Sequence, residues 1–372
     1  SRARMKSIGL IRQASGLIKM KLSNATLADL PKDILRPEYD RTELTAGIVH
    51  IGVGNFHRAH QSWYLHRLMQ QGKAMDWAIV GAGVRAYDME MRGRLAAQDY
   101  LTTLIELSPK GQSTEVVGSM IDYAPIEVGN GALISRMSQP DIQYDAQHPG
   151  APRTAFGAIV AALRARRAAG AGPFTGQSCD NLQGNGEILR QTVVGLARLQ
   201  DPDLADWINE TCSFPNSMVD CIVPSTGPDL IEKAHALGIE DACPVSHENF
   251  RQWVIEDDFC AGRPAWEKVG VTVTDDVHAF EAMKIRILNA GHQVITNVGE
   301  VLSLETISDC MDHALVGALY EKVALEEIVP HVDAVPGMTP TDYVQLIIER
   351  FSNPKIRDTT RRVAFDGSAR HP

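Results

Sequence analysis

The sequence of 372 residues is long enough for two domains or one large one. It is 44% hydrophobic and 22% charged, which is typical of a globular protein with a substantial core. The net charge of −10 argues against nucleic acid as a partner, and no apolar run reaches the roughly 18 residues that a membrane-spanning helix needs. We therefore expect neither a nucleic acid nor a membrane to be a partner of this protein.

The first part of the chain differs from the rest in charge. Residues 1–19 contain basic but no acidic side chains, and the run Met20-Lys-Leu-Ser that follows is typical of a natural start. The apolar run Ile8-Gly-Leu-Ile11 is too short for a signal peptide, and no small-residue cleavage site follows it. Residues 1–19 are therefore interpreted as an N-terminal extension, with a transit peptide as the alternative.

The six cysteines show no spacing that is typical of a metal site. No C-x-x-C pair occurs, and no set of cysteines and histidines has zinc-ligand spacing. We therefore expect free thiols in a reducing cytoplasm and no metal ion. We therefore expect the chemistry of this protein not to depend on zinc.

A strand followed by a glycine turn is the first functional pattern. The β-rich run at 47–52 leads into Gly52-Val-Gly54 and then into a helix-like segment at 60–71. This order is the setting of a dinucleotide-binding loop. Gly52 permits the tight turn, and Gly54 lets the backbone approach a pyrophosphate. The pattern is incomplete, because His57 stands where a third glycine is usual.

A second short strand, at 77–83, is followed by Asp88. In dinucleotide-binding folds an acidic side chain after the second strand hydrogen-bonds the adenosine ribose and repels a 2′-phosphate. Asp88 is therefore interpreted as a cofactor-binding residue, although its distance from Gly54 exceeds the usual ~20 residues. The alternative is that Asp88 is only the N-cap of a helix that begins at Met89.

Strand and helix patterns alternate from residue 47 to about 275, including a predicted strand at 116–121. Asn181 would lie at the carboxyl edge of the sheet, where ligands bind. The pattern after residue 279 is almost entirely helical. The predicted fold is α/β, with a Rossmann-like, mostly parallel sheet domain at 20–278 that binds NAD. A mainly α-helical substrate domain follows at 279–372, with the active site in the cleft between them.

The first segment of the helical domain carries the candidate catalytic residues. In Glu281-Ala-Met-Lys284-Ile-Arg-Ile-Leu-Asn289-Ala-Gly-His292, polar residues interrupt an otherwise apolar helix. At about 100° per residue, Asn289 lies roughly 140° and His292 roughly 80° from Lys284, so the three share one side of the helix. Burial of this set is costly unless it has a function. The alternative is a polar stripe that faces solvent.

These residue types suit proton transfer from a hydroxyl group. A lysine buried in a cleft loses its proton more easily than in water and can act as a base near neutral pH. An amide such as that of Asn289 can hold the developing alkoxide. Glu281 lies one turn before Lys284 and would pass the proton on to solvent, or else form a simple helix ion pair.

Four motifs, taken together, resemble one known family. They are Gly52-x-Gly54-x-Phe56-His57-Arg58-x-His60, Ser178-Cys-Asp-Asn181, Phe214-Pro-Asn-Ser-Met-Val219-Asp220 and Lys284-x4-Asn289-x2-His292. The family is that of the polyol-specific long-chain dehydrogenases and reductases, and the sequence is most similar to its mannitol 2-dehydrogenase group. The resemblance runs from about Met20 to the end of the sequence.

The resemblance implies roles for residues in these motifs. It makes Lys284 the general base at the C2 hydroxyl, Asn181 and Asn289 the amides that hold the C2 oxygen, and His292 a substrate-positioning group. It also implies substrate-binding residues, namely Asp220, Arg362 and Arg370. The implied cofactor-binding residues are Gly52, Gly54, Asn55, Phe56 and Asp88.

The sequence departs from the family pattern in several places. Cys221 replaces an arginine, Arg370 replaces a lysine, and Tyr87 replaces an acid that some relatives carry before Asp88. A strand of the cofactor site, near residue 143, is expected to be absent from this sequence. The helical domain is expected to be shorter than in relatives, because the sequence ends at Pro372.

The resemblance implies a reversible, NAD-dependent oxidation of a polyol at C2, most specifically of D-mannitol to D-fructose, by a monomer or dimer. Two alternatives stay open. One is a uronate oxidoreductase of the fructuronate/mannonate type, against which Cys221 argues because the substrate carboxylate would need another cation. The other is a non-catalytic NAD-binding protein.

Overall fold

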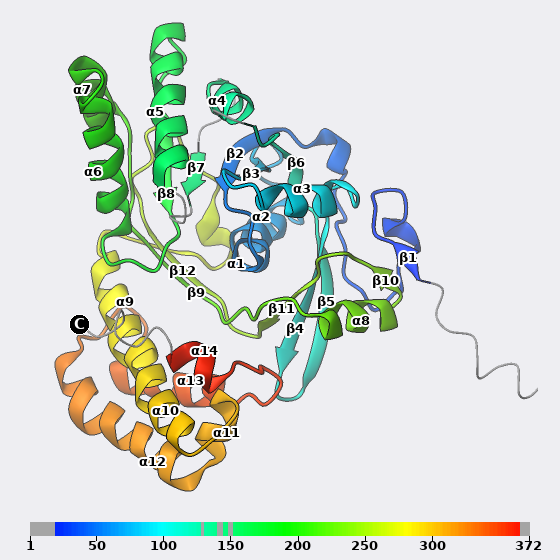
Figure 1. The fold of residues 1–372 in the computed structure, drawn as a ribbon, viewed down its shortest axis with the longest axis vertical. Helices are drawn as coiled ribbons and strands as arrows, with labels where there is room; N and C mark the ends of the chain where they lie inside the picture. Colours follow the sequence, from blue (N-terminus) through cyan, green and yellow to red (C-terminus); the bar gives the residue numbers. More distant parts are fainter. Residues whose placement is uncertain (1–18, 128–129, 140–143, 148–151, 365–372) are drawn as a thin grey trace, which may run out of the picture.

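A computed structural model describes residues 19–127, 130–139, 144–147 and 152–364 (Figure 1). All but the last residue of the extension predicted at 1–19, and the candidate substrate residue Arg370, lie outside the described residues. The predicted fold class is confirmed, because a parallel sheet with helices on both faces is followed by a helical lobe.

The central sheet has five strands in the order β6-β3-β2-β7-β8, and every neighbouring pair is parallel. Its strands are β2 (Ala46–Ile51), β3 (Ala78–Ala82), β6 (Met120–Tyr123), β7 (Tyr144–Gln147) and β8 (Thr175–Ser178). The chain adds β3 and β6 on one side of β2 and then β7 and β8 on the other side. Where the strand order reverses in this way, a crevice forms at the carboxyl end of the central strand, here β2. The glycine turn follows β2 at this position.

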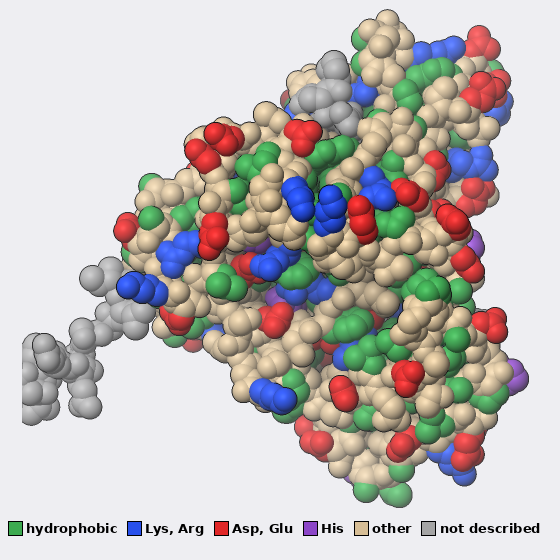
Figure 2. Space-filling model, turned by 180° about the vertical axis from the view of Figure 1, so that it is seen from behind, with side chains coloured by type: hydrophobic (Ala, Val, Ile, Leu, Met, Phe, Trp, Pro, Cys, Tyr) green, Lys and Arg blue, Asp and Glu red, His purple; other side chains and the backbone are tan. Residues whose placement is uncertain are grey.

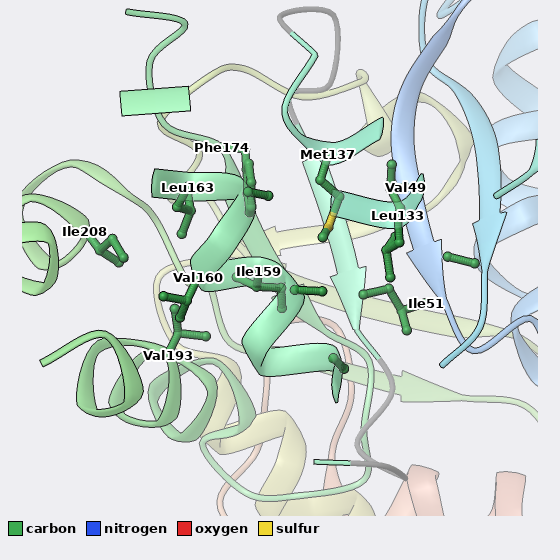
Figure 3. Packing of buried hydrophobic residues seen from close by; sticks show 14 of the residues in the cluster. Val49, Ile51, Leu133, Met137, Ile159, Val160, Leu163, Phe174, Val193 and Ile208 are labelled. Atoms are coloured by element: carbon green, nitrogen blue, oxygen red, sulfur yellow. The ribbon is translucent and has the colours of Figure 1, made fainter. Parts of the chain in front are cut away.

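Alternating residues of β2 face two separate cores. Val49 and Ile51 belong to the core on one side, while Ile48 belongs to the core on the other. Figure 3 shows Val49 and Ile51 beside Leu133 and Met137 in the first of these cores. That face is covered by α4 (Gly131–Met137), α5 (Pro152–Ala169), α6 (Asn185–Arg198) and α7 (Pro202–Thr211). The other face is covered by α1 (Asn55–Ala59), α2 (Gln61–Met69) and α3 (Asp88–Ala96).

The strand predicted at 116–121 is wrong as a single element. The structure has β5 (Gly111–Val117), which pairs antiparallel with β4 (Thr102–Ser108), and then β6 in the parallel sheet. The chain turns between them at Gly118. A Cβ atom at this position would lie only 2.8 Å from Cγ of Pro37 and 2.9 Å from Cδ of Arg41, so only glycine fits here. The Nε of Arg41 donates to the Gly118 carbonyl, which holds the turn.

Three smaller sheets complete the first domain and connect it to the helical lobe. Their orders are β11-β4-β5, β13-β12-β9 and β1-β10. The remaining elements here are β1 (Met20–Lys21), β9 (Ser217–Asp220), α8 (Pro228–Ala236), β10 (Ile239–Glu240), β11 (Val245–Glu248), β12 (Gln252–Glu256) and β13 (Thr272–Thr274). Strand β9 ends at Asp220, next to the first helix of the lobe.

The central sheet is continuous across the position where a family strand is expected to be absent. The four residues of β7 pair with β2 on one side and with β8 on the other. The short run at 144–147 thus occupies the place between them, so β8 keeps its position and Asn181 follows it at the edge of the sheet.

The lobe that follows is helical, as predicted (Figure 1). Its α-helices are α9 (Val277–Met283), α10 (Ala290–Val301), α11 (Ile307–Asp312), α12 (Ala314–Val323), α13 (Pro340–Phe351) and α14 (Thr360–Ala364). Between α9 and α10 the chain continues without a break through a π-helical turn, Lys284–Asn289. The lobe has its own core, which includes Phe280, Tyr320 and Phe351.

Candidate active site

A cavity of about 280 Å³ lies where the sheet domain meets the helical lobe. On the face seen in Figure 2 the surface is hollowed between the two parts. The cavity wall unites the predicted catalytic residues Asn181, Lys284, Asn289 and His292 with Phe56, Asp220 and Arg362. The alternative interpretation of a solvent-facing polar stripe is therefore wrong, since Lys284 is only 5% exposed.

Lys284 joins the lobe to the ends of two strands. Its Nζ donates to Oδ1 of Asn181, which follows β8, at 2.5 Å, and to the carbonyl of Val219 in β9 at 2.7 Å. Two fixed acceptors orient the amine at the wall of the cavity. The geometry brings together a lysine and an amide that lie 103 positions apart in the sequence.

The π-helical turn changes the helical geometry that we expected from the sequence. The predicted angles assumed an α-helix throughout, but Lys284–Asn289 has the wider i→i+5 pattern. Residues five apart then lie close to one another on successive turns, so Lys284 and Asn289 reach the same cavity. The prediction of roughly 140° between them is therefore wrong. Such π-helical insertions occur frequently at functional sites.

His292 is held by packing in the wall of the same cavity. Its ring stacks on that of Phe351 from α13, with centroids 4.3 Å apart and planes inclined by 21°. The side chain is 7% exposed. A stacked and buried ring has few rotamers available, so its edge keeps a fixed direction toward the site.

Glu281 is buried one turn before Lys284 and pairs with a histidine. Its Oε2 lies 2.9 Å from Nδ1 of His278 and accepts from the backbone N–H of Gly184 at 3.4 Å. Burial raises the pKa of the Glu281 carboxyl, against the opposing effect of His278. Glu281 and Lys284 both line a second cavity of about 20 Å³, which shares Asn181 and Lys284 with the larger one. That volume is enough for one water molecule.

Asp220 lines the main cavity but is held from behind by Arg350 of α13. The guanidinium donates to both carboxylate oxygens, from Nη1 to Oδ2 at 2.6 Å and from Nη2 to Oδ1 at 3.0 Å. Burial raises the pKa of Asp220, but the ion pair with Arg350 outweighs burial and the net shift is downward. Asp220 is therefore an anion at neutral pH.

Arg362 reaches the cavity from α14, close to the end of the described residues. Its Nε donates to Oδ1 of Asp358 at 2.7 Å, and its Nη2 donates to Oδ2 of the same carboxylate. The side chain is 60% exposed. The cation therefore lies at the mouth of the cavity, with its guanidinium oriented by a buried carboxylate.

The glycine turn borders a separate pocket of about 320 Å³, which also contains Asp88. Gly52 has φ of +95°, a conformation that favours glycine. An ideal Cβ at Gly54 would meet no atom within 4 Å, so the backbone there faces open space. A close backbone approach and an acidic group across the pocket suit a dinucleotide, and these residues fit NAD.

Asn55 and Phe56 begin the helix after the turn and differ in their contacts. The Asn55 side chain donates to Oγ1 of Thr226 at 2.9 Å and to the Pro224 carbonyl at 3.2 Å. It thereby ties the turn to the loop after β9. The Phe56 ring stacks on that of His60, with centroids 4.8 Å apart, and forms part of the wall of the main cavity.

Asp88 is not the N-cap that the alternative interpretation required, because it is the first residue of α3 and Tyr87 is the N-cap. Its Oδ2 instead accepts from the backbone N–H groups of Val84 and Arg85, both at 3.0 Å. The carboxylate thus shapes the loop after β3 while it borders the cofactor pocket.

The described ranges show neither a metal-ligand cluster nor a membrane-spanning helix. No group of three or more histidine, cysteine, aspartate or glutamate side chains in them is placed to hold a metal ion. No helix in the same part of the chain combines the length and apolar character that crossing a bilayer requires. All six cysteines are free thiols.

Residues 46–268 match the profile described as the mannitol dehydrogenase Rossmann domain, and residues 276–372 match that of the mannitol dehydrogenase C-terminal domain. The chain belongs to the mannitol dehydrogenase family. The resemblance inferred from the four motifs is thereby confirmed.

Individual members of the mannitol dehydrogenase family are similar over most of the chain. Mannitol 2-dehydrogenase of Cereibacter sphaeroides is 53% identical over 370 residues, which are 92% of this chain and 78% of that protein. Mannitol 2-dehydrogenase of Pseudomonas fluorescens, solved as a ternary complex with NAD and D-mannitol, has a TM-score of 0.88 and 40% identity, covering 92% of this chain and 76% of that one. A D-sorbitol dehydrogenase in substrate-free form has a TM-score of 0.87 and 34% identity, covering 94% and 78%.

The sequence did not reveal every residue of this mannitol dehydrogenase family site. The Val219 carbonyl, which holds Lys284, is a backbone atom that no side-chain pattern marks. Arg350 lies on the apolar side of an amphipathic helix, and a buried charge there is the one signal that was available. His57 was noted as a departure from the glycine pattern and as part of a family motif, without a role of its own, yet it forms part of the cavity wall.

Proposed function

We propose that this chain is an NAD-dependent polyol dehydrogenase that oxidises D-mannitol to D-fructose, with Lys284 as general base and without a metal ion. The observation that carries the proposal is the amine of Lys284, fixed at 2.5 Å from the Asn181 amide in the wall of a cavity that also contains Asn289 and His292. The named activities of the similar proteins supply the substrate and the cofactor.

NAD fits the pocket between the glycine turn and Asp88, and it supplies the hydride acceptor of the reaction. Gly52 and Gly54 would lie against its pyrophosphate, since no side chain of the turn blocks the approach. Asp88 would hydrogen-bond the adenosine ribose. Phe56 follows the glycine turn in the chain and forms part of the wall of the catalytic cavity, where its ring would shield the reacting atoms from water.

Lys284 would accept the proton of the C2 hydroxyl in its neutral form. The amides of Asn181 and Asn289 would hold the C2 oxygen as negative charge develops on it. Because Lys284 holds the Asn181 amide before the reaction, that amide needs little reorganisation. His292, kept in place by Phe351, would fix a neighbouring hydroxyl. In ketose reduction the same lysine would return the proton.

We propose that Glu281 relays the proton from Lys284 to solvent. The two side chains share the small cavity of about 20 Å³. One carboxylate oxygen, Oε2, already pairs with His278, whose side chain is 55% exposed. A proton passed through one water to Glu281 could therefore leave through His278. The interpretation of Glu281 as a purely structural ion pair is the alternative.

The substrate would lie between Asp220 and Arg362, with Arg370 as a further contact from the segment beyond residue 364. Asp220 would accept from substrate hydroxyls only with lone pairs that Arg350 leaves available. Arg362 would donate at the mouth of the cavity. A cavity of about 280 Å³ is close to the lower end of ligand-pocket volumes, which suits a small polyol.

The test is the formation of NADH, followed by its near-ultraviolet absorbance, with a panel of polyols and with mannonate. Turnover with D-mannitol is the expected result. Turnover with mannonate alone would favour the uronate oxidoreductase, which the uncharged Cys221 in the cavity wall argues against. Retained NAD binding with no turnover on any substrate would leave a non-catalytic NAD-binding protein.

We expect the protein in the cytoplasm, where its six free thiols would stay reduced. We also keep the prediction of a monomer, or else a dimer. Light scattering of the purified protein at assay concentration distinguishes the two states. Larger assemblies would contradict this part of the proposal.

A further inference from the structure

Arg350 connects the helical lobe to two carboxylates of the sheet domain. Besides its two hydrogen bonds to Asp220, it donates to Glu248 of β11, from Nε to Oε2 at 2.9 Å and from Nη2 to Oε1 at 2.7 Å. All three side chains are at most 5% exposed. One buried arginine thus serves two buried carboxylates, and the ring of Phe250 covers it at 4.1 Å.

The cluster of Arg350, Asp220 and Glu248 adjoins the proposed base, Lys284, through Asp220. Asp220 follows Val219, whose carbonyl accepts from the Nζ of Lys284. The positive charge of Lys284 also acts on the Asp220 carboxylate and lowers its pKa. A carboxylate beside a lysine stabilises the ammonium form, whereas an arginine on the far side of that carboxylate offsets its charge. Arg350 and Lys284 therefore compete for the same negative charge.

We propose that Arg350 is a positioning residue that sets the proton affinity of Lys284 through Asp220. By holding both Asp220 oxygens, Arg350 reduces the stabilisation that the carboxylate gives to the ammonium form, so that the neutral base is available. The inference rests on the proposed function, since it assigns to Arg350 the tuning of the base in that reaction.

Other charged or titratable groups also face this cluster. Asp220 is approached by His60, Tyr64, Cys221, Glu248 and Tyr343. Burial lowers the pKa of His60 to about 3 and raises the pKa of Tyr64 to about 12, so both are neutral in the assay range. Burial raises the pKa of Tyr343 and Cys221 as well, which keeps them neutral near pH 7. Among the residues that the structure describes, Lys284 and Arg350 are then the cations that lower the pKa of Asp220.

Glu248 is the remaining anion in the cluster. Burial raises the pKa of its carboxyl even though Arg350 opposes the shift. Without the arginine, Lys284 still lowers the pKa of Asp220, whereas the charge of Asp220 raises the pKa of Glu248, so Glu248 would take up a proton more readily than Asp220. The effect of removing Arg350 would therefore reach Lys284 mainly through Asp220.

The experiment compares the pH dependence of kcat/KM for mannitol oxidation in the wild type, Arg350→Met, Asp220→Asn and the double variant. Arg350→Met should move the inflection to higher pH, on the order of one pH unit, because Asp220 then stabilises the ammonium unopposed. Asp220→Asn should move it to lower pH. The double variant should lie between the two single variants, because the two charges are coupled.

Arg357→Met is the matched control, because Arg357 is in the same lobe and its pair with Glu305 is exposed. It should leave the inflection unchanged. A purely structural role of Arg350 would lower the rate at every pH without moving the inflection, and that result overturns the inference. If Arg350→Met does not fold, Arg350→Gln, which removes the charge but keeps an amide donor for Asp220, takes its place: an upward shift of the inflection supports the inference and an unmoved inflection overturns it.

Failure of the inference is distinguishable from failure of the proposed function. A wild-type enzyme that oxidises no polyol contradicts the function itself. A wild-type enzyme with a clear inflection that neither variant moves contradicts only the role of Arg350. Affinity for NAD, measured by fluorescence titration, should stay within about twofold in all variants, since the cluster lies outside the cofactor pocket.

Discussion

Lys284 is the side chain on which the proposed chemistry depends. Lys284→Met should lower kcat for mannitol oxidation by at least ~10²-fold, because a positioned general base typically contributes that much. Affinity for NAD should change little, since Lys284 borders the substrate cavity and not the glycine pocket. Steady-state kinetics and a fluorescence titration with NAD measure the two quantities. A variant that keeps more than about a tenth of the wild-type kcat would show that another group is the base.

Asp88 allows a second test at the scale of single residues. Asp88→Asn removes the charge but keeps an oxygen that can accept from the N–H groups of Val84 and Arg85. It should therefore improve the use of NADP relative to NAD by about tenfold, which corresponds to ~1.4 kcal/mol. Asp88→Ala, which also frees the loop, should weaken the binding of both cofactors.

The measurement for Asp88 is kcat/KM with each cofactor, accompanied by binding of adenosine 2′,5′-bisphosphate and of 5′-AMP. Tighter binding of the bisphosphate to Asp88→Asn is the expected result. An unchanged preference between the cofactors would mean that Asp88 only shapes the loop after β3.

At the scale of elements, the joined helices α9 and α10 carry the site and must pack closely on α12. An ideal Cβ at Gly291 would lie only 2.5 Å from Cε2 of Tyr320. Gly291→Ala should therefore lower the free energy of unfolding by about 1–3 kcal/mol, the usual cost of overpacking. It should also reduce kcat, because Asn289 and His292 flank the displaced residue.

Gly195→Ala is the matched control for Gly291→Ala. Gly195 lies inside α6, where an added Cβ meets no atom within 4 Å. This substitution should stabilise the protein by roughly 0.5–1 kcal/mol through the entropy of the unfolded chain. Urea denaturation measures both variants. Equal effects of the two substitutions would mean that the contact with Tyr320 does not constrain the lobe.

The elements themselves were largely predictable from the sequence, whereas their local geometry was not. Alternation of strands and helices indicated the parallel sheet, because β2 has the apolar pattern of a buried strand. The turn at Gly118 was missed, since apolar residues continue on both sides of it and only the approach of Arg41 explains it. The π-helical turn was missed because its hydrogen-bond pattern depends on tertiary contacts that the spacing of residues does not contain.

Within the site, the sequence predicted which side chains take part better than it predicted the groups that they contact. Lys284, Asn289 and His292 lie in one stretch and could be recognised together, and the family resemblance added Asn181. The contact between Arg350 and Asp220 spans 130 positions, so sequence spacing says nothing about it. Asp88 was expected at the cofactor pocket, but its hydrogen bonds to the loop came only from the structure.

For the whole molecule, the ion pair between Asp220 and Arg350 fastens the lobe to the sheet domain. Because this pair holds the pKa of folded Asp220 below its ordinary value of 3.8, its contribution to stability is present above that pH. The contribution is lost as the pH falls through the lower, folded-state pKa. Asp220→Asn should therefore cost about 3 kcal/mol at neutral pH, and the difference from wild type should shrink below pH 3.8.

Urea denaturation at several pH values tests this expectation, with Asp206→Asn as the control. Asp206 pairs with Arg198 on the surface, where its side chain is 58% exposed. That substitution should change the free energy of unfolding by less than about 1 kcal/mol at any pH. A cost for Asp220→Asn that does not vary with pH would show that the carboxylate charge does not fasten the two parts.

The central claim, that Lys284 moves the proton in both directions, is tested most directly by two pH profiles on wild type and on Lys284→Met. Mannitol oxidation with NAD needs the neutral amine, so its kcat/KM should rise with pH and then level off. Fructose reduction with NADH needs the ammonium, so its kcat/KM should fall through the same inflection, and both inflections should vanish in Lys284→Met. Parallel profiles, or an inflection near pH ~6.5 that survives the substitution, would assign the proton to His292 and contradict the mechanism.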